Sequence, residues 1–185
     1  MLYGQGADRG TRQGASIHTR LLCGGMTMLK AHWTGSGYSE PLTNADQIAL
    51  GLGTDKRWYR YTNMPHNRLT LHYGGVQYRP HDGLIHDYGS IPCMLQGWPI
   101  LRRWFSKDSF PKSVVVHDAG YDKLVAGREH TLWISRDKGE TWNLEPVQRE
   151  VIDLLLYVGI LAEDGPGWVA KTYYRAVQVF GRFCW

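Results

Sequence analysis

The feature that most constrains the fold of this chain is a carboxylate inside an apolar helical run. Residues 146–160 carry apolar side chains at helical spacing, and Asp153 lies within the same run. A buried carboxylate without a partner costs several kcal/mol, so Asp153 requires a hydrogen-bond donor or a cation. We therefore expect the helix that carries Asp153 to pack against an element that supplies this partner.

An earlier helical segment offers the candidate partner. Residues 111–124 begin with a proline suited to a first helical turn and carry apolar residues at helical offsets. Within this segment His117 and Tyr121 are one turn apart on the same face, and Asp118 points about 100° away from them. The pattern predicts a buried His117–Asp153 pair with Tyr121 beside it.

Two interpretations of this group are open. In the first, Asp153 orients His117 so that the other ring nitrogen acts as a general base on water, with Tyr121 nearby, as in many hydrolases. In the second, the same residues form a polar network that joins two helices to a loop and needs no substrate. This structural network would also include Asp87, Ser90 and Asp118, and we favour it because structural networks collect the same residue types.

Several residues could in principle ligate a metal. His81, Asp82, His86, Asp87, His117 and Asp118 include the ligand types of zinc, manganese and calcium sites. Their spacing matches no specific metal motif, so we expect no cofactor, with calcium or another divalent cation as the alternative. The three cysteines are far apart and lack CxxC spacing, which predicts neither a disulfide framework nor a zinc ribbon.

The rest of the chain predicts an α+β fold with a small antiparallel sheet and three helices in the C-terminal half. Thr43 and Asp46 have the spacing of a capping box for a short helix. Residues 69–73 and 76–78 alternate across Gly74-Gly75 as in a two-residue hairpin. Residues 58–61 predict a further strand, and residues 168–180 predict the third helix.

One further hairpin, residues 130–143, is expected as an insertion between the first two of these helices. Its turn, Ser135-x-Asp137-x-Gly139-x-Thr141-Trp142, resembles the Asp-box of sialidase-type propellers. In that turn the aspartate caps the loop, the glycine takes a positive φ and the tryptophan packs beneath it. A single copy cannot build a propeller, so Asp137, Gly139 and Trp142 are assigned a structural role in the turn.

The N-terminal third has a different composition. Residues 1–40 are rich in glycine and lack periodicity, which predicts an extended arm that a partner chain holds, followed by one domain over residues 41–185. The net charge of +4 is too small for a dedicated nucleic-acid binder. The longest apolar run, residues 151–162, is shorter than the roughly 20 residues of a membrane helix, and no export signal is expected.

Four segments over residues 67–183 resemble an uncharacterised family of tailed bacteriophages and prophages. The family pattern is Gly-Phe-x-Thr-Asp-x-x-Ser-[Ile/Val]-Pro, then His-Asp-x-x-Tyr, then Ala-Asp, then Tyr-x-Ala-Val before a glycine. Here the segments are Gly83–Pro92, His117–Tyr121, Ile152-Asp153 and Tyr174–Val177. His86 stands where the family has Thr, and Ile152 where it has Ala. The resemblance implies a phage-encoded protein of the structural or tail module.

The His-Asp-x-x-Tyr segment also resembles the catalytic helix of secreted phospholipases A2. That resemblance implies His117 as the base, Asp118 as a calcium ligand and Asp153 as the carboxylate that orients the histidine. The glycine-rich calcium loop and the disulfides of those enzymes have no counterpart in this sequence.

The sequence therefore predicts a structural component of a phage virion, assembled in the host cytoplasm, in the tail, neck or baseplate. Its arm and its aromatic surfaces would bind other phage structural proteins as an oligomer, because Tyr and Trp bury much area with few rotamers. The alternatives are a virion-associated hydrolase of lipid or peptidoglycan that uses His117 and Asp153, and a connector plug that contacts DNA. No membrane insertion is expected.

Overall fold

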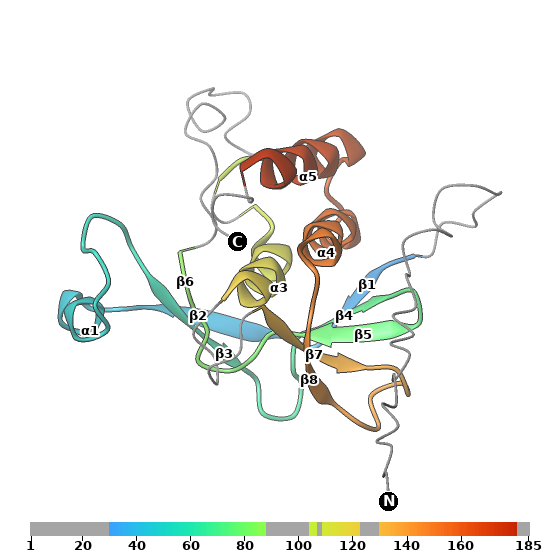
Figure 1. The fold of residues 1–185 in the computed structure, drawn as a ribbon, viewed down its shortest axis with the longest axis horizontal. Coiled ribbons are helices and arrows are strands. Elements are labelled where there is room, and N and C mark those ends of the chain that lie inside the picture. The colour runs from blue at the N-terminus through green and yellow to red at the C-terminus, as the bar shows by residue number, and fades with distance from the viewer. Residues whose placement is uncertain (1–29, 88–103, 107–108, 123–129, 181–185) are drawn as a thin grey trace, which may run out of the picture.

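Helices stack above antiparallel sheets in the computed structural model, which describes residues 30–87, 104–106, 109–122 and 130–180 (Figure 1). The chain is α+β. The large sheet has five strands in the order β1-β4-β5-β7-β8, and the small sheet has three in the order β2-β3-β6. In chain order the elements are β1 (His32–Thr34), β2 (Gly37–Pro41), α1 (Asn44–Ala49), β3 (Tyr59–Asn63), β4 (Thr70–Tyr73), β5 (Val76–Arg79), β6 (Ile85–His86), α3 (Pro111–Tyr121), β7 (Thr131–Ser135), β8 (Asn143–Pro146), α4 (Arg149–Ala162) and α5 (Gly167–Phe180).

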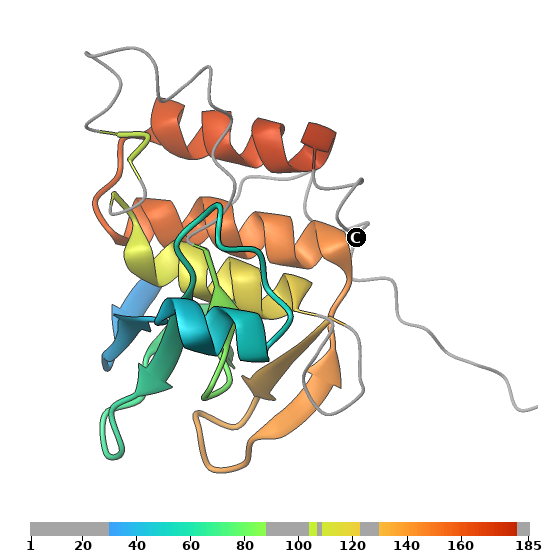
Figure 2. The same ribbon diagram turned by 90° about the vertical axis from the view of Figure 1, so that its left-hand side faces the viewer.

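One face of the large sheet forms the floor of the main core. The strand registers place Trp33, Leu71, Tyr78 and Ile134 in a single row across neighbouring strands. These side chains pack with the buried faces of α3 and α4, including Val116 and Leu155. Seen edge-on in Figure 2, α3 and α4 lie directly above the strands, and α5 forms an outer layer.

Helix α4 is covered on two sides, which explains its nearly continuous apolar sequence. On one side Ile152 and Leu155 join the core above the large sheet. On the other side Leu156 and Ile160 pack with Val169 and Tyr173 of α5 in a second cluster. None of the helices in the described ranges is long and apolar enough to cross a membrane.

Helix α3 approaches α4 closely at a glycine. A Cβ atom on Gly120 would lie 2.7 Å from the Ile152 side chain, so only a glycine leaves room for this contact. The two helices therefore meet at the level where His117, Tyr121 and Asp153 are carried.

The predicted elements are confirmed over most of the described chain. The three C-terminal helices are present as α3, α4 and α5, and β4 and β5 form the predicted hairpin. Gly74 and Gly75 both have a positive φ, as a tight hairpin turn of this kind requires. The short helix α1 begins at Thr43, whose side chain and Asp46 form the capping box.

Two details of the arrangement differ from the sequence expectation. Residues 32–34 and 37–40, placed in the arm, belong to strands β1 and β2. Trp33 of β1 packs against the core, and its indole Nε1 donates a hydrogen bond to Gly159 O at 3.1 Å. The hairpin expected as an insertion is integral to the large sheet, because β7 pairs with β5 as well as with β8 and buries Leu132. Residues 1–29 of the predicted arm lie outside the described residues.

Candidate functional site

The carboxylate of Asp153 lies between α3 and α4 and is fully buried. Three side chains approach it, and together the four residues are called the Asp153 cluster. Tyr121 donates a hydrogen bond from its hydroxyl to Asp153 Oδ1 at 2.7 Å. The Nε2 atom of His117 lies 3.6 Å from the same oxygen, and Arg149 Nε lies 3.9 Å from Oδ2. The structure thus brings together His117, Tyr121 and Asp153, the residues that the sequence proposed as a catalytic group.

Helical spacing positions each member of the Asp153 cluster. His117 and Tyr121 are one turn apart on α3, and their rings lie with centroids 4.5 Å apart. Arg149 and Asp153 are one turn apart on α4. The sequence interpretation missed Arg149, although a basic residue four positions before a buried carboxylate is a recognisable pairing signal.

A second set of contacts extends from His117 toward the small sheet. His117 Nδ1 lies 3.5 Å from Asp118 Oδ1, and Asp118 Oδ2 lies 3.7 Å from Nδ1 of His86 on β6. The other nitrogen of His86 is 2.9 Å from the hydroxyl oxygen of Ser39 on β2. Imidazoles and carboxylates therefore alternate from α4 through α3 to both of these strands.

Burial and nearby charges shift the pKa values of His117 and His86 in opposite directions. Burial alone lowers the pKa of His117, but the carboxylates of Asp118 and Asp153 outweigh it and raise the pKa overall. For His86 burial prevails over the attraction of Asp118 and Asp87, and its pKa is lowered. The two imidazoles therefore favour opposite protonation states over the same pH range.

The remaining sequence candidates lie elsewhere. Asp87 forms an ion pair with Lys56 at 2.6 Å, and its charge acts on the pKa of His86 and not on that of His117. His81 pairs with Asp122 at 3.2 Å, and Asp82 accepts a hydrogen bond from the backbone of Asn63 at 2.7 Å. Ser90 lies outside the described residues. Within the described part of the chain no three His, Cys, Asp or Glu side chains are grouped so that they could hold a metal ion.

The Asp-box residues form a closed turn at the end of β7. Asp137 accepts hydrogen bonds from the Ser135 hydroxyl at 2.7 Å and from the Thr141 amide at 3.0 Å, and also from the Thr141 hydroxyl. Gly139 has a φ of 95°, and Trp142 Nε1 donates to its carbonyl oxygen at 3.1 Å. These hydrogen bonds hold the pKa of Asp137 far below its usual value. The Asp137 carboxylate thus serves as the hydrogen-bond acceptor that closes the turn.

The geometry around His117 limits the chemistry that it can perform. A general base needs one ring nitrogen held by a partner and the other directed at the proton that it removes. Here Nε2 faces Asp153 and Nδ1 faces Asp118. Nδ1 is within hydrogen-bond distance of Asp118, whereas Nε2 is buried beside Asp153 and forms no hydrogen bond within the described residues. Two carboxylates therefore flank the imidazole and favour its charged form between the two helices.

Comparisons of the chain with protein-family models, with curated proteins and with solved structures found no match.

Proposed function

We propose that this protein is a structural component of a tailed-phage virion, in the tail, neck or baseplate, that binds neighbouring subunits. The observation that carries the structural part of the proposal is the position of the buried His117 imidazole between the carboxylates of Asp118 and Asp153. An imidazole flanked by two carboxylates stabilises the packing of the helices as a cation, whereas a hydrolytic base would need its second nitrogen directed at a substrate and not at Asp153.

The phage part of the proposal rests on the resemblance of four sequence segments. Two of them contribute to the contacts described above, through His117, Asp118, Tyr121 and Asp153. The residues that carry the resemblance thus join α3 to α4. This supports a family whose shared feature is a scaffold, onto which each member adds its own binding surfaces.

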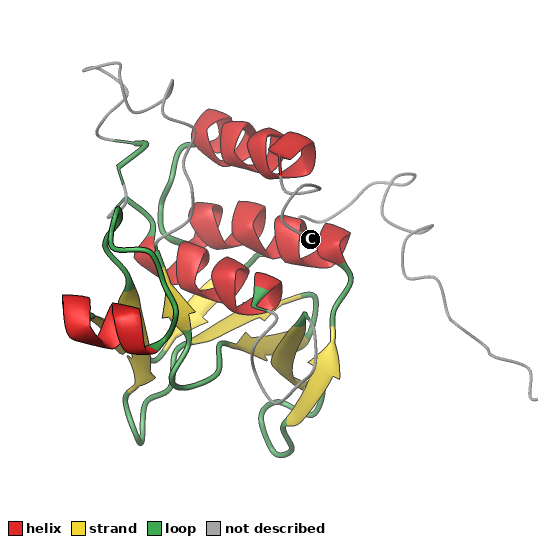
Figure 3. Cartoon of the chain, turned by 60° about the vertical axis from the view of Figure 1, so that its left-hand side comes forward, coloured by secondary structure: helices red, strands yellow, loops and turns green. Residues whose placement is uncertain are grey.

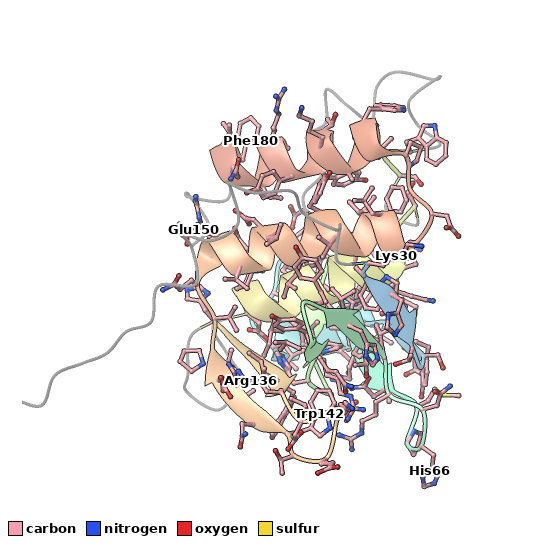
Figure 4. All side chains as sticks on the ribbon, turned by 90° about the vertical axis from the view of Figure 1, so that its right-hand side faces the viewer. Lys30, His66, Arg136, Trp142, Glu150 and Phe180 are labelled. Atoms are coloured by element: carbon pink, nitrogen blue, oxygen red, sulfur yellow. The ribbon has the colours of Figure 1, made fainter. Side chains whose placement is uncertain are left out.

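Exposed apolar side chains supply candidate contact surfaces for neighbouring subunits. Helix α5 exposes about half of each of Trp168, Val179 and Phe180 on the outer layer of the fold. Phe180 lies at the far end of this helix in Figure 4. Large rigid apolar side chains of this kind dominate the energetics of subunit interfaces.

The test is incorporation into particles of the phage or prophage that encodes the chain. The full-length protein, a form lacking residues 1–29 and the α5 variant Trp168→Ala are each supplied in place of the native copy, and purified particles are assayed by immunoblotting. We expect the full-length protein in the particles and less of both altered forms. Absence of the full-length protein from particles would refute the virion role.

The hydrolase alternative has weaker support because of the two carboxylates on His117. It makes a separate prediction, which is turnover of lipid or peptidoglycan by the full chain that the His117→Gln variant lacks. Turnover lost in this variant while its free energy of unfolding stays unchanged would favour the hydrolase.

A further inference from the structure

The outer face of the large sheet has a charge pattern that the whole-chain charge conceals. No described helix covers this face, because α3, α4 and α5 all lie on the opposite side (Figure 3). The strand registers and the alternation of side chains place eleven residues on it. They are His32, Thr34, Thr70, His72, Gln77, Arg79, Thr131, Trp133, Ser135, Leu144 and Pro146. Of these, Thr70, Thr131 and Ser135 are buried. None of these is a carboxylate, and the one carboxylate that contacts them, Asp137, accepts a hydrogen bond from the Ser135 hydroxyl at 2.7 Å at the edge of the face.

Arg79 is the central cation of this face. Its guanidinium lies 3.6 Å from the centroid of the Trp142 ring, and its Nε donates to the Thr70 hydroxyl at 2.8 Å. No carboxylate in the described residues forms an ion pair with Arg79 or with exposed Arg68, which precedes β4 on the same side. Burial and the nearby Arg68 lower the pKa of the Arg79 guanidinium, as expected for adjacent cations without a counter-ion.

Aromatic rings lie beside these cations. The imidazoles of His32 and His72 are stacked with centroids 4.4 Å apart and planes 13° from parallel. The hydroxyl oxygen of Thr34 is 2.7 Å from His72 Nε2 and holds that ring in place. His32 is exposed, so its ring caps the stack toward the solvent. Figure 4 shows Trp142 at the lower side of the molecule, away from the helices.

We propose that this face, from His32 across Arg79 to Trp142, binds a single-stranded nucleic acid. Arg68 and Arg79, which form no ion pair with a described carboxylate, attract the phosphates, and the strands themselves direct no carboxylate to this face. The exposed ring of His32 at the end of the histidine stack offers a stacking platform for bases, which single strands leave accessible. An acidic protein partner would satisfy the arginines but would leave the ring stack without a role. The proposal is independent of the virion role.

The test uses the full-length chain and a fluorescein-labelled oligothymidylate of about 16 nucleotides, the upper end of single-strand site sizes. Fluorescence anisotropy is measured over a series of salt concentrations. We expect binding that weakens with salt, and the variants Arg68→Gln and Arg79→Gln should each reduce the log–log salt slope by about 0.7, the value for one phosphate contact on a single strand. His32→Ala should weaken binding by about tenfold at constant salt, because one stacking platform is lost.

The matched control is Arg175→Gln, which removes an exposed arginine from α5 on the opposite side of the molecule. Arg68 is also exposed, so its variant keeps the test independent of any loss of packing between Arg79 and Trp142. The proposal is overturned if the full chain does not bind at low salt, or if Arg175→Gln weakens binding as much as Arg68→Gln does. Tighter binding to a duplex of the same length overturns it too, because paired bases cannot stack on the rings.

Discussion

The hydroxyl of Tyr121 donates a hydrogen bond of 2.7 Å to Asp153, which lies 32 residues further along the chain on the neighbouring helix. Asp153 has no exposed surface, so water cannot replace this donor. The Tyr121→Phe variant should therefore unfold with a free energy about 1–3 kcal/mol smaller than the original chain. Urea denaturation followed by circular dichroism measures the difference.

Tyr157→Phe is the control for this prediction. Tyr157 packs against the same core, and its hydroxyl has no hydrogen-bond partner in the described part of the chain. Equal stability losses in the two variants would show that the hydroxyl of Tyr121 contributes nothing specific.

His117 should make the stability of the protein depend on pH in a direction that its raised pKa determines. The imidazole titrates near 6.5 in the unfolded chain and above that value in the folded chain. Its stabilising effect is therefore fully present below about pH 6.5 and is lost as the pH rises through the folded pKa. The original chain and His117→Gln are compared by urea denaturation from about pH 5.5 to 8.5.

The difference in unfolding free energy between these two proteins should shrink as the pH increases. A difference that grows with pH would mean that His117 is held neutral, contrary to its contacts with Asp118 and Asp153. The lowered pKa of His86 makes its own contribution to stability change with pH in the opposite direction. The effect of His117 is therefore obtained from the difference between the two proteins, and not from the pH profile of the original chain alone.

Because α3 and α4 are in close contact at Gly120, even an alanine at this position should destabilise the fold. In an exposed helix Gly→Ala stabilises by about 1 kcal/mol. At Gly120 the added Cβ would lie 2.7 Å from Ile152, so Gly120→Ala should destabilise by about 1–3 kcal/mol. Gly167→Ala, where nothing lies within 4 Å, is the matched control and should be neutral or slightly stabilising. Thermal unfolding of both variants checks the pair, and stabilisation by both would contradict the close approach.

The Asp137→Ala substitution should loosen the turn at the end of β7 without destabilising the rest of the fold. Replacing Asp137 with alanine removes the acceptor of the Ser135 hydroxyl and of the Thr141 amide and hydroxyl. Amide hydrogen exchange at Thr141 should therefore accelerate, while exchange in α4 stays unchanged. Glu140→Ala, an exposed neighbour in the same turn, should leave the exchange of Thr141 as it is. Protection of Thr141 that survives Asp137→Ala would remove the assigned role of the carboxylate.

Local patterns predicted most of the helices and the Gly74-Gly75 hairpin because those signals act over a few residues. Pairing across the sheets could not be predicted in the same way. Trp33 follows a glycine-rich segment, and only its contact with Gly159, 126 residues away, shows that it belongs to the core. Likewise nothing near β7 in the sequence indicates that it would pair with β5.

The Asp153 cluster was partly predictable for a similar reason. A buried carboxylate needs a partner, and helical spacing selected His117 and Tyr121. Whether His117 is a base or a structural cation depends on what faces its second nitrogen. Helical spacing could not predict which group faces the second nitrogen. Asp118, which approaches Nδ1 of His117, is the next residue in the chain and does not share the helical face of His117.

The bond from Trp33 to Gly159 also has a mechanical consequence. It tethers β1, the first strand that the structure describes, to the helix that carries Asp153. Tension applied to the chain ahead of β1 therefore acts on α4 as well as on β4, the strand with which β1 pairs. Trimming the chain up to residue 31 keeps this tether, whereas trimming it to residue 35 cuts it.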